Sequence, residues 1–473
     1  MVPTTAFLWP AYHSFQFPEG TLSHADCIPI EPEIYERLLS HASQENDFVY
    51  LGSVGKGDNR GQLTGFSALA SEKLSRSFDS NKPCGPDSIA NLIEESLEPF
   101  SLPVSDNAGC LKGGWIGFIS YEFGHEVETR LHTHRRKMPA PLINAGLYLW
   151  MASYDRPTGS HCLWVHPGAP HWLRERLDAW QTTPTAPIAM SWKTLSPFQA
   201  RQDKSQFEAS VEKVRDYIAA GDCYQANLSQ EFTAPYTGDP WQAFRALAEN
   251  NPTPHSGFIR SDGAAVLSVS PERFLRIENN TVTTSPIKGT RPRGHNPSED
   301  EALARELQNS EKDLAENLMI VDLLRNDLSK SAVDGSVQVD GLFALESYRN
   351  VHHLVSHIRC QLAPGVSPMK ALFDAFPGGS ITGAPKIRAM EIIRELEPHD
   401  RGPYCGSVFY RSMDGLLESN IAIRTLYADD NGVVHCCGGG GIVADSDPES
   451  EYQETLTKVK SLMEFLETLG GGS

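Results

Sequence analysis

A single lysine, Lys288, stands between a strand-like run and a segment rich in turn-forming residues. Residues 281–284 alternate as a β-strand does, and the glycines and proline of residues 289–294 predict a sharp turn. If Arg291 and Arg293 fold back toward Lys288, they would disfavour its charged form and leave a nucleophilic amine. The alternative is a basic turn on the protein surface.

Two pairs of acidic residues could bind a divalent metal ion. Asp313 and Glu316 lie three positions apart near the start of one predicted helix, as do Glu451 and Glu454 in another. Carboxylates at this spacing share a helix face, and oxygen ligands from two helices suit Mg2+. Each pair also has a structural interpretation, because Ser310 with Asp313 resembles a capping box and glutamates pair with lysines one turn later. If the pairs converge, their mutual repulsion would call for a bound cation.

Glu272 follows an apolar run over residues 264–270 and could act as a general acid. Burial at the end of this strand would raise its pKa, so that the carboxyl group keeps its proton near neutral pH. The alternative is an exposed glutamate that balances nearby arginines.

Two glycine-rich segments could approach a ligand closely. Residues 378–386 lack the lysine that a phosphate-binding loop requires, but Thr382 as a helix N-cap would still create an anion site. The run Gly438–Gly441 allows close backbone approach to a ligand. A plain helix start and a hairpin turn explain the same two segments.

His353 and His357 have the spacing of a metal-binding pair on a helix. Residues 351–358, however, have the pattern of a strand, and no glutamate stands where a zinc hydrolase would need one. We therefore reject a metal site here, and His353 is expected to lie in the core or in a pocket.

Helical and strand-like patterns alternate along the chain, which predicts a mixed α+β fold. A helix is predicted over residues 204–220, and apolar residues at helical spacing predict another that buries Leu314, Leu318, Val321, Leu324 and Leu328. A last helix is predicted from Pro448. The predicted strands are residues 113–121, 147–151, 162–165, 223–232 and 264–270.

Length and composition limit the class of protein. A chain of 473 residues predicts two domains or one large two-layer fold, with a boundary near residues 181–187 and an appended tail at 470–473. The net charge of −19 argues against a nucleic-acid-binding or anionic-membrane surface. Without a signal peptide or a long apolar segment, and with nine unpatterned cysteines, the chain is expected to be cytoplasmic with reduced thiols.

These segments together resemble the chorismate-utilising enzymes, the family of anthranilate synthase component I, salicylate synthase and isochorismate synthase. Residues 195–467 resemble the chorismate-binding region of the family. Residues 1–190 resemble the N-terminal region of its aminating members, and residues 113–124 carry most of that likeness. It rests on the motifs 270–274, 286–294, 315–323, 353–356, 377–386, 423–425 and 440–443, and on Glu451 with Glu454 and Thr455.

The resemblance implies a fold, a substrate and roles for the candidate residues. The expected fold is a two-subdomain β-sandwich core flanked by helices, and the expected substrate is chorismate. Lys288 and Glu272 would act as nucleophile and acid, and Asp313, Glu316, Glu451 and Glu454 would surround Mg2+. The residues expected to hold or line the substrate are Arg424, Tyr404, Lys458, His353, Thr382, Gly439, Gly440 and Gly441.

Two positions indicate a branch within the family. Most relatives have alanine where this chain has Lys288, and a lysine there resembles the branch that aminates carbon 4 of chorismate for p-aminobenzoate and folate synthesis. Water-using relatives have a lysine base where this chain has Gln225. Ammonia would come from a separate glutaminase subunit, because no cysteine here has a nucleophile-elbow context. Some relatives also bind tryptophan in the N-terminal region. Two other functions remain as alternatives to carbon-4 amination: anthranilate synthesis, and a catalytically silent regulatory role.

Overall fold

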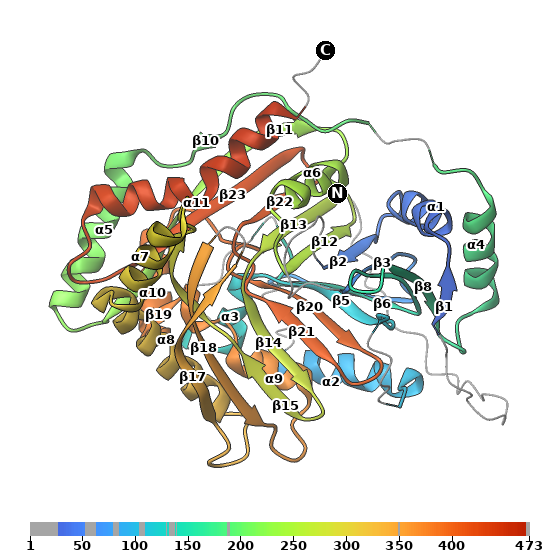
Figure 1. The fold of residues 1–473 in the computed structure, drawn as a ribbon, viewed down its shortest axis with the longest axis horizontal. Coiled ribbons are helices and arrows are strands. Elements are labelled where there is room, and N and C mark those ends of the chain that lie inside the picture. Colours follow the sequence, from blue (N-terminus) through green and yellow to red (C-terminus); the bar gives the residue numbers. More distant parts are fainter. Residues whose placement is uncertain are drawn as a thin grey trace.

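The fold consists of two large antiparallel β-sheets with helices around them (Figure 1). The computed structural model describes residues 27–52, 63–78, 85–103, 109–128, 130–131, 138, 140–186, 190–348 and 351–469. The tail at 470–473 lies outside these residues.

The first sheet has 13 strands within the described part of the chain. Its order is β1 (Ile28–Ile30), β8 (Ser160–Val165), β7 (Trp150–Asp155), β3 (Leu63–Ser67), β2 (Val49–Leu51), β12 (His255–Ser261), β13 (Ala264–Ser270), β22 (Thr425–Ala428), β23 (Val433–Ile442), β11 (Gln225–Thr237) and β10 (Gln199–Ala200). Two short strands, β9 (Lys193–Thr194) and β19 (Gly383–Ala384), also pair with β11.

The second sheet has 10 strands in the same described residues. Its order is β16 (Ile287–Pro292), β18 (Val351–Gln361), β15 (Thr281–Thr284), β14 (Arg273–Glu278), β21 (Leu417–Asn420), β20 (Ser407–Ser412), β5 (Gly114–Ile119), β6 (Ile143–Tyr148) and β4 (Glu72–Arg76). The strand β17 (Gln338–Ser347) pairs with β18. Each sheet therefore combines strands from both sides of the predicted boundary at residues 181–187.

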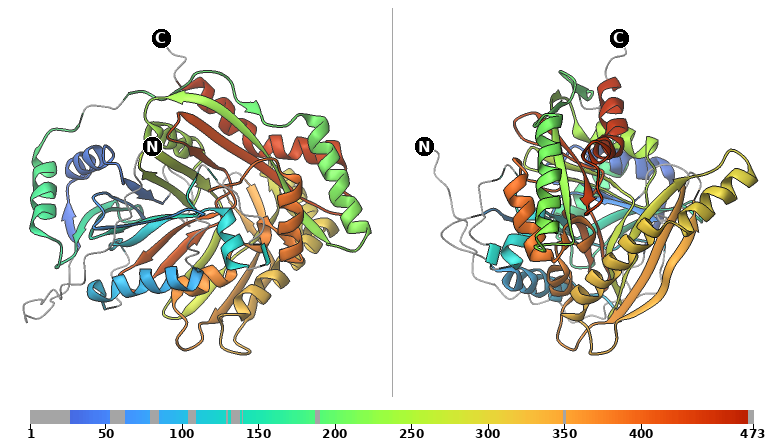
Figure 2. Two further views of the ribbon diagram at one scale, coloured as in Figure 1. Left: turned by 180° about the vertical axis from the view of Figure 1, so that it is seen from behind. Right: turned by 90° about the vertical axis from the view of Figure 1, so that its left-hand side faces the viewer.

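Helices cover the outer faces of the sheets. They are α1 (Pro32–Ala42), α2 (Pro86–Leu97), α3 (Gly124–Val127), α4 (His171–Thr182), α5 (Lys204–Ala219), α6 (Pro240–Asn250), α7 (Pro297–Gln308), α8 (Glu311–Ser329), α9 (Pro368–Ala375), α10 (Lys386–Leu396) and α11 (Pro448–Thr468). Short 3-10 helices span Glu98–Phe100, Tyr121–Phe123 and Gly379–Ile381. Seen from behind, α2 and α9 pack side by side below the sheets (Figure 2).

The helices form where capping residues and an apolar face coincide. In α5, Asp203 makes a capping box with Gln206, and Phe207, Val211 and Val214 are buried against β11. The helix α11 starts at Pro448 after the N-cap Asp447 and lies against β23 and α5. The predictions of these two helices are confirmed.

Several local predictions differ from the structure. Residues 289–294 do not form a sharp turn, because β16 continues to Pro292. The pairing of β16 with β18 shifts register between Ile287 and Thr290, and Gly289 lies in this irregularity with a φ of +80°. Leu318 is exposed rather than buried, because the buried face of α8 is rotated toward Ile320 and Leu324. Residues 147–151 are split between β6 and β7, which belong to different sheets.

The prediction that all cysteines are reduced thiols is wrong for one pair. Cys27 and Cys110 form a disulfide with a Cα–Cα distance of 6.5 Å and a sequence separation of 83. Their spacing gives no pattern in the sequence, because only the folded sheets bring the segment before β1 next to the segment before β5. Among the described residues, no helix combines the length and apolar character needed to cross a membrane.

Candidate active site

Lys288 and Glu272 meet at the loop that follows α9. Lys288, on β16, donates a hydrogen bond of 3.5 Å from Nζ to the carbonyl oxygen of Ser380. Glu272, between β13 and β14, is 7% exposed, and the same serine donates a hydrogen bond to its carboxylate. Burial raises the pKa of Glu272, and the nearby charge of Lys288 and the Ser380 bond reduce this rise. An amine and a buried acid therefore lie beside one another.

The two arginines beside Lys288 are occupied by carboxylates. Arg291 forms ion pairs with Glu306 at 2.7 Å and with Asp313 at 3.2 Å. Arg293 pairs with Asp300 at 2.6 Å. The expectation that both arginines turn toward Lys288 is wrong, because acidic residues of α7 and α8 neutralise them. The local charges that act on Lys288 come instead from Glu272, Glu316 and Glu454.

The two acidic pairs approach one another from α8 and α11. Burial raises the pKa of Glu316, and the charges of Asp313 and Glu454 raise it further. Burial also raises the pKa of Glu451, with a further rise from Glu454. The charges of Glu316 and Glu454 therefore act on one another across the two helices, and a shared metal site for the two pairs stays a prediction.

Protein cations already offset part of this negative charge. Lys458 pairs with Glu454 at 2.7 Å, and Lys312 lies 4.0 Å from Glu316. Among the described residues, no group of three or more His, Cys, Asp or Glu side chains is arranged to hold a metal. These ion pairs offset part of the repulsion between the carboxylates, and binding of Mg2+ stays a prediction. The four candidate donors are all carboxylates, whose oxygen atoms are the ligands that Mg2+ prefers.

The glycine run belongs to a strand and not to a hairpin turn. Gly439, Gly440 and Gly441 lie in β23 and pair with β11. A Cβ on Gly440 would lie 3.2 Å from Glu451 Oε2, and a Cβ on Gly441 would lie 2.1 Å from Gln225 Nε2. Glycine is needed here because carboxylates pack on one side of the strand and Gln225 on the other.

Arg424 carries an unbalanced positive charge near these elements. It has a φ of 50°, a left-handed conformation that costs about 1–3 kcal/mol for a residue with a side chain. Desolvation lowers the pKa of its guanidinium, although part of the side chain is exposed. Within the described residues its guanidinium makes no hydrogen bond or ion pair, although its backbone carbonyl accepts a bond from the Val269 N–H. A strained arginine without a counter-ion is a candidate receptor for an anionic ligand.

Tyr404 and Lys458 occupy different kinds of position. Tyr404 is 6% exposed, and burial raises the pKa of its hydroxyl well above its usual range. Lys458 Nζ donates a hydrogen bond of 2.8 Å to the Gly439 carbonyl in addition to its pair with Glu454. Lys458 thus lies at the glycine strand, and contact of either side chain with substrate stays a prediction.

Thr382 is buried but is not the N-cap of α10. Its hydroxyl donates a 3.1 Å hydrogen bond to the Gly378 carbonyl, and Pro385 occupies the cap position without a side-chain cap. The prediction of a Thr382 cap is wrong because the loop folds back on itself before α10 begins. His353 lies opposite Thr290 across β16 and β18, and its Nδ1 is 2.9 Å from the threonine hydroxyl.

Two residues of the site were not predicted from the sequence. Ser380 contacts both Lys288 and Glu272, but these three residues come from separate segments and no spacing links them. Lys312 stands four positions before Glu316 on α8, and this spacing could have identified it as a partner.

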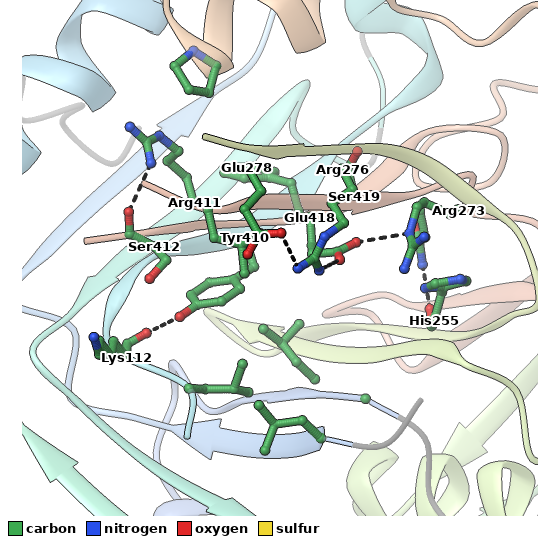
Figure 3. Close-up of a pocket in the computed structure, with 18 of the residues that line it drawn as sticks. Lys112, His255, Arg273, Arg276, Glu278, Tyr410, Arg411, Ser412, Glu418 and Ser419 are labelled. Carbon is green, nitrogen blue, oxygen red and sulfur yellow. Dashed lines mark hydrogen bonds and ion pairs between the residues drawn. The ribbon is translucent and has the colours of Figure 1, made fainter. Parts of the chain in front are cut away.

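A cavity lies elsewhere, between strands of both sheets (Figure 3). It has a volume of about 740 Å3. Figure 3 shows Arg273 and Arg276 turned toward Glu418, and these groups form ion pairs. The wall also includes Lys112, which pairs with Asp414 at 3.4 Å. None of the predicted site residues lines this cavity.

Comparison with known proteins identifies the family. Residues 56–464 match the family model described as chorismate binding enzyme. The chain is 43% identical over 383 residues to "Aminodeoxychorismate synthase component 1" of Salmonella typhimurium, covering 80% of this chain and 83% of the relative. It is 44% identical over 356 residues to the protein of the same name from Escherichia coli, with coverages of 75% and 77%.

Solved structures share the fold. Anthranilate synthase component I from Streptococcus pneumoniae matches with a TM-score of 0.72 and 29% identity, covering 87% of this chain and 94% of that one. The menaquinone-specific isochorismate synthase of Escherichia coli has a TM-score of 0.69 at 19% identity, covers 91% of each chain, and supports the fold alone.

The two antiparallel sheets and their surrounding helices define an α+β fold. The buried acid beside an amine indicates an enzyme. The chain belongs to the chorismate binding enzyme family and is a chorismate-utilising enzyme. The family and the fold class predicted from the sequence are confirmed.

Proposed function

We propose that this chain is component I of aminodeoxychorismate synthase. The reaction joins chorismate and ammonia to give 4-amino-4-deoxychorismate and water. The observation that carries this proposal is the position of Lys288, whose amine and the buried acid Glu272 both contact Ser380. This arrangement provides a nucleophile and a proton donor for the same substrate ring.

The acid and the amine divide the substitution into two steps. Glu272, whose pKa is raised by burial, gives its proton to the departing 4-hydroxyl, which leaves as water. Lys288 attacks carbon 2 with its lone pair, and the ring double bond shifts as the hydroxyl leaves. Ammonia then forms a bond at carbon 4, and the bond between carbon 2 and Lys288 breaks. Protons released by the two amines return Glu272 and Lys288 to their starting states.

Two residues support this branch over others in the family. Lys288 stands where most relatives have alanine, and such a lysine resembles the carbon-4 aminating branch. Gln225, which packs against Gly441, stands where water-using relatives have a lysine base. A neutral amide cannot deprotonate water, so it favours ammonia as the nucleophile. The names of the relatives from Salmonella typhimurium and Escherichia coli support the same branch.

The remaining predicted residues would hold the substrate. The unbalanced charge of Arg424 suits a chorismate carboxylate, and Tyr404, Lys458, His353, Thr382 and residues 439–441 would complete the surroundings. Bound Mg2+ would position the ring carboxylate of chorismate and offset its charge. The ion would be held by four carboxylates, those of Asp313, Glu316, Glu451 and Glu454. Burial favours the protonated forms of Glu316 and Glu451, so these two groups would lose their protons when the metal binds.

Ammonia would be supplied by a separate glutaminase subunit, and a cytoplasmic location fits this pathway. Within this proposal, residues 1–190 form the N-terminal region and residues 195–467 the chorismate-binding region. Tryptophan binding in the N-terminal region stays a prediction, for which the 740 Å3 cavity is a location to test.

The proposal is tested by the product of the reaction. The purified protein is incubated with chorismate, MgCl2 and ammonium chloride, and the products are separated by liquid chromatography with fluorescence and mass detection. We expect aminodeoxychorismate, which an added lyase converts to p-aminobenzoate, and no such product from Lys288→Ala. Fluorescent anthranilate as the main wild-type product would support the anthranilate synthase alternative. No product at all would support the catalytically silent alternative.

A further inference from the structure

The amine of Lys288 and the carboxyl group of Glu272 act on one another without forming an ion pair. Burial raises the pKa of Glu272, and the nearby charge of Lys288 partly offsets this rise. Among the described residues, however, no carboxylate lies within ion-pairing distance of the Lys288 amine. A direct pair would hold the amine protonated and the acid ionised, whereas the proposed reaction needs a neutral amine and a protonated acid. Their separation therefore matters to the reaction.

Ser380 contacts both groups, each with a different atom. Its backbone carbonyl accepts a 3.5 Å hydrogen bond from Lys288 Nζ. Its side-chain hydroxyl donates a hydrogen bond to the Glu272 carboxylate. Ser380 is 6% exposed and Glu272 is 7% exposed, so the contact between the hydroxyl and the carboxylate is shielded from water. The relative position of the amine and the acid thus depends on two atoms of one residue.

Hydrogen bonds and close packing fix the segment that carries Ser380. Thr382 is buried, and its hydroxyl donates a 3.1 Å hydrogen bond to the Gly378 carbonyl. The carbonyl of Thr382 accepts a 2.7 Å hydrogen bond from the N–H of Asn227 on β11. Just before the serine, a Cβ on Gly379 would lie 3.0 Å from a leucine side chain of α8. The segment therefore has little room to move at Ser380.

Two cationic side chains hold the backbone on either side of Ser380. Arg401 is 3% exposed and donates a 2.9 Å hydrogen bond to the carbonyl of Ile381. Its charge is balanced by Glu397 at 2.7 Å. Lys386 donates a 3.1 Å hydrogen bond to the carbonyl of Ala375, at the end of α9. Ser380 thus occupies its position before substrate binds, and groups that are already in place do not have to be ordered during the reaction.

We propose that Ser380 is a positioning residue that keeps Lys288 and Glu272 side by side but separate, holding the amine with its carbonyl and the acid with its hydroxyl. The inference rests on the proposed function, in which the amine attacks carbon 2 and the acid protonates the hydroxyl on carbon 4. Only carbon 3 separates these positions, so the two groups must reach one ring without pairing with each other. A carbonyl only accepts hydrogen bonds and suits the amine, whereas a hydroxyl can donate to the carboxylate.

The test removes the hydroxyl of Ser380 and leaves its carbonyl in place. Ser380→Ala makes this change, and Ser380→Thr keeps a hydroxyl as the conservative variant. Ser67→Ala is the matched control, because Ser67 is a fully buried serine on β3 whose hydroxyl donates a 2.7 Å hydrogen bond to the Trp150 carbonyl. Each protein is assayed for aminodeoxychorismate with chorismate, MgCl2 and ammonium chloride over a series of pH values, and its thermal unfolding is measured. If Ser380→Ala does not fold, Ser380→Gly removes the same hydroxyl.

We expect Ser380→Ala to lower kcat by about tenfold or more and to change the KM for chorismate by less than about twofold, because the hydroxyl positions an acid and holds no substrate. The falling limb of its pH–rate profile should lie at higher pH than in the wild type. The Ser380 hydrogen bond lowers the pKa of Glu272, so its removal lets the acid keep its proton to higher pH. Ser380→Thr should keep the wild-type limb and most of the wild-type kcat, and Ser67→Ala should match the wild type.

Three results would contradict this role. An unchanged kcat in Ser380→Ala would overturn the inference. A loss of kcat without a shift of the falling limb, or a loss that Ser67→Ala shares, would show that the serine only supports the fold and would overturn it as well. A wild-type protein that makes no aminodeoxychorismate would overturn the proposed function, and the inference with it.

Discussion

The site around Lys288 and the 740 Å3 cavity are both lined by charged side chains, but only the Lys288 site includes charged groups without an ion-pair partner among the described residues. In the cavity, Arg276 contacts both Glu278 and Glu418, and Lys112 contacts Asp414. At the Lys288 site, Arg424 has no counter-ion among the described residues, and Glu272 is buried with a raised pKa. The 740 Å3 cavity is thus a place whose charges are already satisfied.

This difference indicates where chemistry can occur. A charge that a neighbour neutralises has little remaining tendency to bind a ligand or transfer a proton. A buried acid or an unpaired arginine keeps that tendency, at a cost to the stability of the fold. Cavity volume alone would have pointed to these paired charges and not to the candidate site at Lys288. The following changes test this comparison, beginning with the largest expected effect.

Glu272→Gln should remove the proton donor and lower kcat by about 10²–10⁴-fold. In the wild type, activity should fall as pH rises through the raised pKa of Glu272, because the carboxyl then loses the proton it must donate. The variant should lack this falling limb, which a pH–rate profile measures. A variant with near wild-type kcat and the same profile would show that another group is the acid. Glu278→Gln, at the paired cavity, is the matched control.

Arg424→Ala should weaken chorismate binding by about 2 kcal/mol, or roughly thirtyfold in KM, through loss of a charged hydrogen bond. The measurement is the KM for chorismate at saturating MgCl2 and ammonium. Arg276→Ala removes a paired arginine and should leave this KM unchanged. If both substitutions raise the KM equally, the difference between paired and unpaired arginines has no functional meaning.

Glu316→Gln should raise the MgCl2 concentration needed for half-maximal activity by about tenfold. Removing metal with a chelator should abolish the wild-type activity, and added MgCl2 should restore it. Glu306→Gln, which changes an exposed partner of Arg291, is the control for charge removal near the site. Full wild-type activity in the presence of the chelator would contradict the role given to the four carboxylates.

Lys112→Met should change chorismate turnover by less than about twofold, because its ion pair with Asp414 lies in the second cavity. The expected consequence is confined to stability, with a higher cost than for an exposed pair because the lysine is 5% exposed. Denaturant unfolding and steady-state kinetics measure the two effects separately. A large loss of kcat with normal stability would place this cavity in the catalytic reaction.

The sequence predicted the elements that periodicity and capping determine. The helix at α5 and the strand over residues 264–270 were predicted because their local patterns match their burial. The turn predicted over residues 289–294 was wrong because pairing with β18 overrides the turn preference of the glycines and proline. Ser380 and the Cys27–Cys110 disulfide could not be predicted, since their partners meet only through the folding of distant segments.

The central claim, that Lys288 is a nucleophile, is tested most directly by trapping its adduct. The protein is mixed with chorismate and MgCl2 without ammonia, quenched in acid and examined by intact-mass and peptide mass spectrometry. We predict a mass increase equal to chorismate minus one water, located on Lys288 and absent from Lys288→Ala. A wild-type protein that forms aminodeoxychorismate with ammonia but shows no adduct on Lys288 would contradict the claim.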